Sequence, residues 1–154
     1  EVQIDTDLEI YIPDDYVNIV KERLKLYKEL SQIKTSKALE EFEAKLKDRF
    51  GPLPLEAKEL LESVRLKWVA RQLGIERLII KKELCLSYFL SDQQSQFFQS
   101  EKFNYLINQI EKFSERMILK EKNTANGPKL LLSINKITDI KSLTKLLNSL
   151  VVPN

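Results

Sequence analysis

The spacing of apolar residues changes at Gly74, and this change limits the fold more than any other feature. Before Gly74, apolar residues recur every three or four positions, as on one side of a helix. After it, "RLIIKKELCLSYF" alternates, which predicts two short strands around a tight turn at Lys82-Glu83. Helices and hairpins in separate stretches are typical of an α+β fold rather than a parallel, doubly wound sheet.

Three helices are predicted before Gly74. The first lies in "DDYVNIVKERLKLYKEL", residues 14–30, where the apolar stripe is Val17, Val20, Leu24 and Tyr27. The second lies in residues 35–50, where Thr35 or Ser36 can cap the start. Its spacing predicts the ion pairs Glu41–Lys45 and Glu43–Lys47. The third runs to about Leu73, and its apolar stripe is Ala57, Leu60, Leu61, Val64 and Trp68.

The stretch "RFGPLP" predicts a rigid corner between the second and third helices. Gly51 can adopt the left-handed conformation that closes a helix, and Pro52 prevents its continuation. Pro54 suits the first turn of the next helix, where a missing N–H costs nothing. The predicted corner residues are Phe50, Gly51, Pro52 and Pro54.

The remaining segments complete the predicted fold. "VQIDTDLEIYIP" alternates, so we expect residues 1–13 to form an extended arm, either a linker from an upstream region or an edge strand. Residues 14–154 are expected to form a single α+β domain. After the first hairpin come a helix at "SEKFNYLINQIEKF", a hairpin with a turn at Asn126-Gly127-Pro128, and a final helix with Ile140, Leu143, Leu147 and Leu150 in line. The four strands of the two hairpins predict a small antiparallel sheet.

The composition argues against most catalytic sites. The chain has no histidine, one cysteine and three glycines. It therefore lacks the commonest general base, a cysteine-rich metal site and a glycine-rich phosphate loop. Glu40, Glu41 and Glu43 are interleaved with lysines and are interpreted as a solvated helix face. The prediction is that this chain is not an enzyme and holds no metal or cofactor.

The expected environment is the bacterial cytoplasm. Cys85 has no partner for a disulfide, no run of 18 apolar residues exists, and the acidic first 15 residues do not suit a signal peptide. Because the sequence begins with Glu1 rather than Met, we interpret it as a piece of a longer protein. The net charge of +2 provides no strong attraction to nucleic acid or membranes.

Two surfaces are candidates for interactions. Glu41, Lys45 and Asp48 are spaced as one exposed ridge on the second helix, and Arg49 adjoins it; such mixed charge suits recognition of a protein. The alternative is a nucleic-acid-binding face with Lys67, Arg71 and Lys81, near Trp68. Phe97-Phe98 is interpreted either as an exposed docking element or as a loop tucked under a helix.

Several motifs resemble those of a known family. "YIPDDYV", "RLKLYKEL", "DRFGPLP" and the later "LGI" occur here in the order and spacing found in the C-terminal domain of the bacterial transcription-repair coupling factor (Mfd). The resemblance is close over residues 8–75 and looser as far as Asn154.

The resemblance implies a regulatory role without catalysis. In that family the C-terminal domain packs on a UvrB-like module of the same chain, masks the surface that binds UvrA, and restrains an ATP- and Mg²⁺-dependent DNA translocase. The parent protein removes stalled RNA polymerase from DNA and recruits nucleotide excision repair. We expect Glu41, Lys45, Asp48 and Arg49 to contact the UvrB-like module, and the isolated fragment to be monomeric or weakly self-associating. Arg49 bridging to Asp48 or a neighbouring helix is the competing interpretation.

Overall fold

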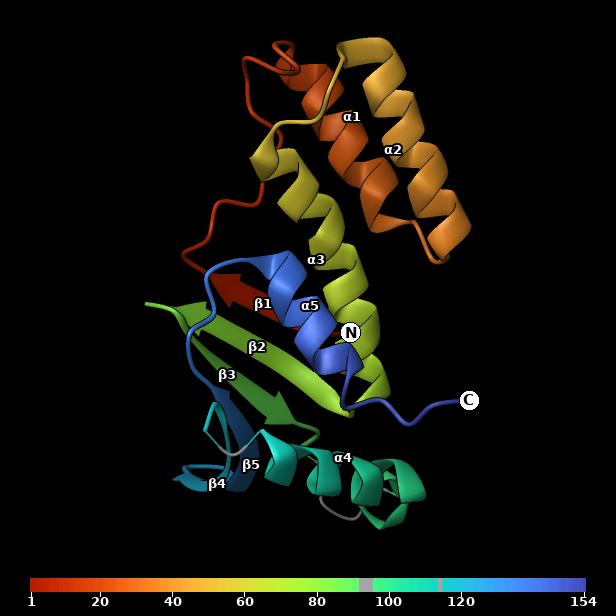
Figure 1. Ribbon diagram of the computed structural model, residues 1–154. Helices are drawn as coiled ribbons and strands as arrows, with labels where there is room; N and C mark the ends of the chain where they lie inside the picture. The colour runs from red at the N-terminus through yellow and green to blue at the C-terminus, as the bar shows by residue number, and fades with distance from the viewer. Residues whose placement is uncertain (92–95, 114) are drawn as a thin grey trace. The chain divides into compact units, whose positions relative to one another are not determined.

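The computed structural model of the chain describes residues 1–91, 96–113 and 115–154 (Figure 1). These residues form five α-helices and a mixed sheet of five strands, which confirms the predicted α+β class. They divide into two compact units. The sheet unit comprises Glu1–Leu8 and Leu66–Asn154, and the helical unit comprises Glu9–Arg65. The boundary falls within α3 (Leu55–Gln72).

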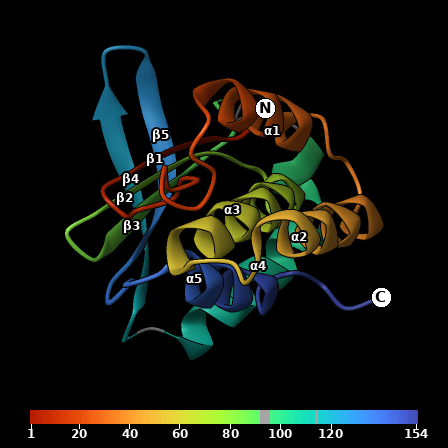
Figure 2. The ribbon, with the colours of Figure 1, turned by 90° about the horizontal axis from the view of Figure 1, so that it is seen from above.

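The sheet unit contains all five strands in the order β1-β2-β3-β5-β4. The strands are β1 (Gln3–Thr6), β2 (Ile75–Lys81), β3 (Leu84–Phe89), β4 (Met117–Thr124) and β5 (Gly127–Ile134). Both predicted hairpins are present, and Lys82 and Glu83 turn the first one with φ of 52° and 63°. Figure 2 shows the β4–β5 hairpin crossing the direction of β2 and β3, as accumulated strand twist produces.

The sheet differs from the antiparallel prediction at one edge. β1 pairs with β2 in parallel, with Gln3 opposite Arg77 and Thr6 opposite Ile80. A parallel pair needs a long connection, and the whole helical unit lies between these two strands in the sequence. A bond beside the ladder adds to this pairing: the Asp7 carboxylate, just after β1, accepts a hydrogen bond from the Lys82 N–H at 2.9 Å.

Two helices of the sheet unit contribute to its apolar core. α4 (Glu101–Lys112) and α5 (Ile140–Asn148) begin at Ser100 and Asp139, whose side chains cap them. The buried residues of α4, α5 and the segment after α5 include Leu106, Ile110, Ile140, Leu143, Leu147 and Leu150. The sheet adds buried Leu78, Ile80, Cys85, Phe89, Leu132 and Ile134. The four apolar positions predicted in the last helical segment are thus all buried.

An aromatic cluster fills one part of the sheet unit. Phe97 and Phe98, in the short 3₁₀ helix η1 (Gln96–Gln99), make edge contacts with Phe103 of α4 at ring distances of 5.6 Å and 5.3 Å. Both side chains are half-buried, so the tucked arrangement is confirmed and the exposed docking element is wrong. Gly74 lies under this cluster: a Cβ placed there would approach the Phe97 ring to 2.5 Å.

The helical unit contains α1 (Val20–Ser31), α2 (Ser36–Phe50) and the first part of α3. The predicted start of the first helix was wrong. The N–H groups of Tyr16 and Val17 both donate to the Pro13 carbonyl, which forms a separate turn before α1 begins. The predicted stripe was also wrong: Val20 and Leu24 are exposed, and Leu26 and Leu30 are the buried residues of α1.

The chain turns sharply where α2 meets α3. Thr35 caps α2 by accepting from the Ala38 N–H at 3.1 Å, and Gly51 ends the helix with φ of 89°. The Pro54 carbonyl then accepts from the N–H groups of Ala57 and Lys58, which starts α3. The α3 stripe differs from the prediction, because Trp68 is only half-buried while Leu66 and Val69 are buried. Within the described residues, no helix is long and apolar enough to cross a membrane.

Candidate functional site

The second helix presents a charged face on the side opposite its buried residues. Leu39, Phe42 and Leu46 form the buried side of α2. Glu41 and Asp48 are seven positions apart, so they lie two helical turns apart on the exposed side. Lys45 and Arg49 lie on the flank between these two sides. The predicted ridge is therefore present on the surface of α2, but its four residues have different surroundings.

The two cations of the ridge pair with α1. Lys45 bonds to the Glu29 carboxylate and lies 5.3 Å from the centre of the Phe42 ring. Arg49 bonds to Glu22 at 3.0 Å and lies 4.8 Å from the centre of the Phe50 ring. The structure thus places Arg49 against a neighbouring helix, as the competing interpretation held.

Only one of the two predicted ion pairs within α2 forms. Glu43 and Lys47 pair at 3.0 Å on the far flank of the helix, as the spacing predicted. The predicted Glu41–Lys45 pair was wrong, because Glu29 of α1 takes Lys45 instead. Glu22 and Glu29 were missed by sequence reasoning, since a contact between helices leaves no signal in the spacing along one helix.

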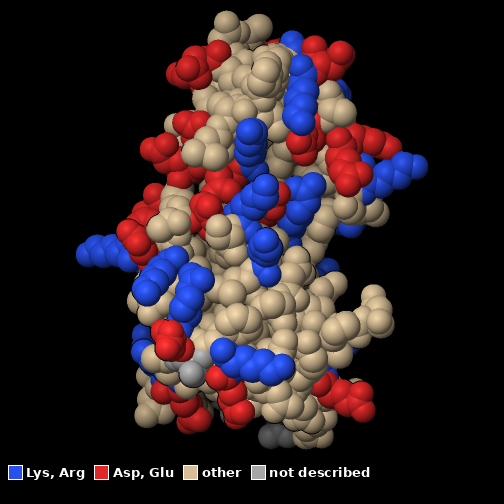
Figure 3. All heavy atoms as spheres, viewed as in Figure 1, with Lys and Arg blue, Asp and Glu red and all other residues tan. Residues whose placement is uncertain are grey.

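The two acids of the ridge remain available. Glu41 and Asp48 are exposed, and neither side chain makes an ion pair or hydrogen bond to another residue in ranges 1–91, 96–113 and 115–154. They stand on a helix held to α1 by the Lys45 and Arg49 bonds. Figure 3 shows acidic and basic side chains on the surface of the helical unit. The arrangement presents two exposed negative charges on a helix whose Lys45 and Arg49 side chains bond to α1.

Tyr16 fastens the corner next to the ridge. Its hydroxyl donates to the Gly51 carbonyl at 2.7 Å and lies 3.2 Å from the Leu46 carbonyl. Its ring packs against Phe50 at 5.8 Å between centres. Burial raises the pKa of Tyr16 above its ordinary value, so the hydroxyl remains a donor at neutral pH. This bond ties the end of α2, where Asp48 and Arg49 lie, to the segment before α1.

The residues of the nucleic-acid alternative are less available than the sequence suggested. Lys67 is half-buried on α3, and Arg71 is exposed one turn further along. Lys81 lies at the far end of β2 from the loop that follows α3, and it pairs with Asp5 at 3.4 Å. The three residues are not brought together by any contact, and the nucleic-acid alternative has no further support from the structure.

The described residues offer little for catalysis. They contain no cluster of three or more Asp, Glu or Cys side chains that could hold a metal ion. Burial raises the pKa of the Cys85 thiol to about 11, and the hydrogen bond to Ser87 offsets only part of this rise. The thiol is therefore protonated and buried at neutral pH.

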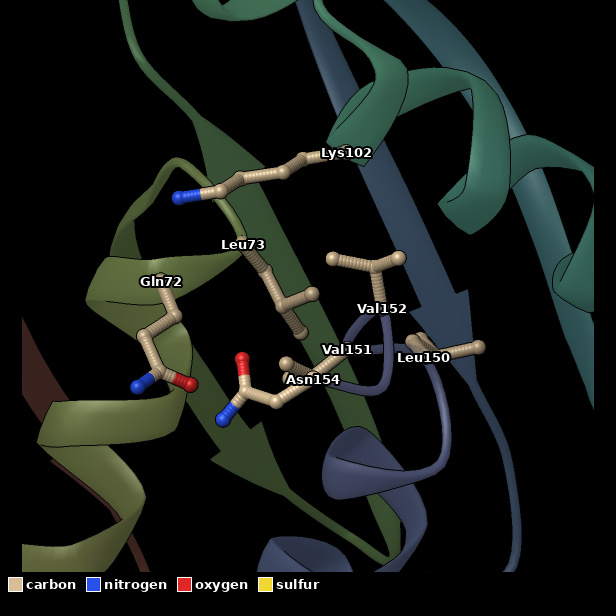
Figure 4. Close-up of a pocket in the computed structure, with 7 residues that line it drawn as sticks. All are labelled: Gln72, Leu73, Lys102, Leu150, Val151, Val152 and Asn154. Atoms are coloured by element: carbon tan, nitrogen blue, oxygen red, sulfur yellow. The ribbon is translucent and has the colours of Figure 1, made fainter.

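A hollow of about 210 Å³ lies in the sheet unit, beside the last residues of the chain (Figure 4). Figure 4 shows Leu73 between the Lys102 side chain and the amides of Gln72 and Asn154, with Val152 and Leu150 to their right. No two of its lining groups can act as an acid and base pair, because lysine is its only ionisable side chain.

Comparison with known proteins agrees with the sequence motifs. The model of the TRCF domain family matches residues 6–100, which cover the whole helical unit and the strands β2 and β3 but only the last residue of β1. The chain belongs to the TRCF domain family. The transcription-repair-coupling factor of Escherichia coli is 38% identical to it over 78 residues, which are 51% of this chain and 7% of that protein.

Two further comparisons extend the similarity along the chain. The transcription-repair-coupling factor of Staphylococcus epidermidis is 26% identical over 145 residues, or 94% of this chain and 12% of that protein. The crystal structure of the C-terminal domain of a transcription-repair coupling factor has the same fold, with a TM-score of 0.69 and 22% identity. The matched region is 97% of this chain and 92% of that structure. The chain spans about a tenth of the length of the Escherichia coli and Staphylococcus epidermidis proteins that it matches.

Proposed function

We propose that this domain is the non-catalytic, autoinhibitory C-terminal part of a transcription-repair coupling factor. In this proposal the exposed ridge of α2 contacts a UvrB-like module of the same long chain and covers the surface that binds UvrA. The contact also restrains an ATP- and Mg²⁺-dependent DNA translocase, whose engagement with RNA polymerase and DNA releases the domain. The wider process is transcription-coupled DNA repair.

The observation that carries the proposal is the pair of exposed acids, Glu41 and Asp48, on a helix fixed from its other flank. Charged groups held in one geometry set the register of a contact more than they add to its strength. A contact of this kind suits a switch, because its free energy must be small enough for the motor to overcome.

Lys45 and Arg49 then have two tasks. Their bonds to Glu29 and Glu22 orient α2, and roughly half of the Arg49 side chain remains exposed to meet a partner. Glu41 and Asp48 have no competing bond in the described parts of the chain, so they are the residues on which the contact depends most. Membership of the family supports the setting, and the geometry of α2 supports the choice of residues.

The test is the affinity of UvrA for the full-length coupling factor that carries this domain. Charge reversal by Asp48→Lys and Glu41→Lys removes the acids without touching a buried residue. A contact with a coupling free energy of ordinary size is worth roughly 5- to 150-fold in affinity. We therefore expect the double variant to bind UvrA at least about fivefold more tightly than the unaltered protein.

Glu40→Lys is the matched control, because Glu40 is exposed on the same helix but outside the ridge. It should leave the affinity for UvrA unchanged. Arg49→Glu repeats the test from the flank and should also increase UvrA binding. Equal affinity of the double variant and the unaltered protein, with the domain folded in both, would remove the ridge from the proposed contact.

A further inference from the structure

The outward face of α1 carries apolar side chains that nothing in the described structure covers. Ile19, Val20 and Leu24 are 55%, 59% and 64% exposed. Val20 and Leu24 are one turn apart on the same side of α1, and Ile19 is the N-cap residue next to them. Exposed apolar side chains that are grouped in this way mark contact sites more often than single ones do.

The charges of α1 are sorted between its two sides. Both of its acids, Glu22 and Glu29, bond to Arg49 and Lys45 of α2. The lysines of α1 all face outward: Lys21, Lys25 and Lys28 are exposed and form no ion pair with the described residues. A merely solvated helix face usually mixes the two signs, whereas this one presents three positive charges beside three apolar side chains.

We infer that the face formed by Ile19, Val20, Lys21, Leu24, Lys25 and Lys28 binds an acidic protein segment that carries apolar side chains. This α1 face is a second contact surface, separate from the ridge of α2. The two lie on different helices, and the α1–α2 ion pairs lie between them. The inference therefore does not depend on the proposed function of the ridge.

The chemistry of the face selects this partner over a nucleic acid. Three lysines match carboxylates or phosphates equally well, because either neutralises a positive charge. A phosphate backbone would leave Val20 and Leu24 in water, whereas an amphipathic acidic segment covers them and pairs the lysines together. The long apolar stems of the lysines extend the area that such a segment can bury.

The experiment is a titration of the 154-residue chain with a designed peptide, followed by the NMR shifts of its backbone amides. The probe is a peptide of about 18 residues, long enough to form a helix on binding. It contains leucines at helical spacing and glutamates elsewhere. At physiological salt we expect saturable binding, with the shifts centred on α1. Leu24→Ser and Lys25→Glu should each weaken it by about tenfold, since each removes a central contact.

Three controls distinguish the alternatives. Lys58→Glu makes the same charge change at an exposed site on α3 of the same unit and should change the affinity less than about twofold. A peptide with serine in place of leucine keeps the charge, and one with lysine in place of glutamate keeps the apolar stripe; both should bind much more weakly. Equal binding of the serine peptide would overturn the inference.

Duplex DNA of about 20 base pairs, enough for several phosphate contacts, is the last probe. DNA binding that Lys25→Glu abolishes and Leu24→Ser leaves intact would assign the face to nucleic acid and overturn the inference. Absence of saturable binding at millimolar peptide would also overturn it. Leu24→Ser changes an exposed residue, so a loss of binding in this variant does not come from loss of the fold.

Discussion

The two compact units are held together in different ways. The sheet unit has paired strands over an apolar core and a cluster of four phenylalanines. The helical unit contains no strands in its described residues 9–65, and its segments are joined by polar bonds as well as by apolar packing. These polar bonds include the bond from the Ile12 N–H to the Tyr27 hydroxyl at 2.6 Å, the bond from the Tyr16 hydroxyl to the Gly51 carbonyl, and the ion pairs between α1 and α2. Polar bonds at half-exposed positions mainly orient surface groups, whereas an apolar core mainly contributes stability.

This difference matches the distribution of candidate surfaces. Both of them, the ridge of α2 and the face of α1, lie in the helical unit. The ion pairs that join its helices take the acids of α1 and two cations of α2, and thereby decide which charges face outward. The sheet unit shows no comparable sorting among its described residues, because its pairs, such as Lys81–Asp5, neutralise exposed charges locally.

The largest expected effect compares a glycine in each unit. Gly74→Ala combines a positive φ of 73° with a Cβ that would meet the Phe97 ring, which its neighbours Phe98 and Phe103 hold in place. We expect a loss of about 3 kcal/mol, from about 1–2 kcal/mol of conformational cost and a similar cost of overpacking. Urea denaturation measures it.

Gly51→Ala is the matched control in the helical unit. Its φ of 89° is also left-handed, but nothing lies within 4 Å of the added Cβ. Only a conformational cost of about 1–3 kcal/mol applies, because this φ together with ψ of −170° lies in a region that almost only glycine adopts. A loss at Gly74 no larger than its own conformational cost of about 1–2 kcal/mol would show that the Phe97 ring moves aside freely and that the aromatic cluster is not rigid.

The second prediction is that the two units lose stability at different alkaline pH values. The Cys85 thiol has an ordinary pKa of 9.0 that burial raises to about 11, so the neutral form is favoured in the folded sheet unit. Its stabilising contribution is complete below pH 9 and is lost as the pH rises from 9 to 11. The loss is on the order of 2 kcal/mol. Fluorescence of Trp68, the single tryptophan, reports unfolding of this unit.

Cys85→Ala should remove this decline between pH 9 and 10. The smaller side chain also lowers the stability of the fold, but by the same amount at every pH. In the helical unit the corresponding group is Tyr16, whose pKa is raised from 10.0. Its contribution is complete below pH 10 and falls only above it. Amide exchange of α1 and α2 should therefore remain unchanged between pH 9 and 10, after correction for the intrinsic rate. A simultaneous loss of both units at pH 9 would contradict the comparison.

The smallest expected effect concerns the Arg49–Glu22 pair. Both side chains are more than a third exposed, so water and salt screen their attraction. A double-mutant cycle with Arg49→Ala and Glu22→Ala should give a coupling free energy of about 0.2–1 kcal/mol. High salt should reduce it. A coupling above this range would mean that the polar bonds stabilise the helical unit as well as orienting its surface.

Local signals predicted much of this fold. Thr35 caps α2 as expected, Gly51 ends it, and the hairpin at Lys82-Glu83 lies where the alternation indicated. Such features depend on neighbours within a few residues. The start of α1 was missed because the N–H groups of Tyr16 and Val17 close a separate turn on the Pro13 carbonyl, which the helical spacing of the segment does not reveal.

Contacts between distant segments could not be predicted in the same way. The parallel pairing of β1 depends on β2, about 70 residues later, and no local pattern specifies it. For the candidate site, the exposure of Glu41 and Asp48 followed from helical spacing. The partners of Lys45 and Arg49 lie on another helix, so spacing along α2 could not predict them. The exposure of Val20 and Leu24 depends on which side of α1 packs against α2, which spacing along α1 does not specify.

The four-residue strand β1 has a mechanical consequence. It is the short edge through which the chain enters the sheet before it leaves for residues 9–65. A pull along its axis loads the ladder to β2 in shear, so the main-chain bonds and the Asp7–Lys82 bond resist together instead of opening one after another. A strand this short would still be the first element to slip under tension, and its release would bare the edge of β2 while the hairpins stay closed.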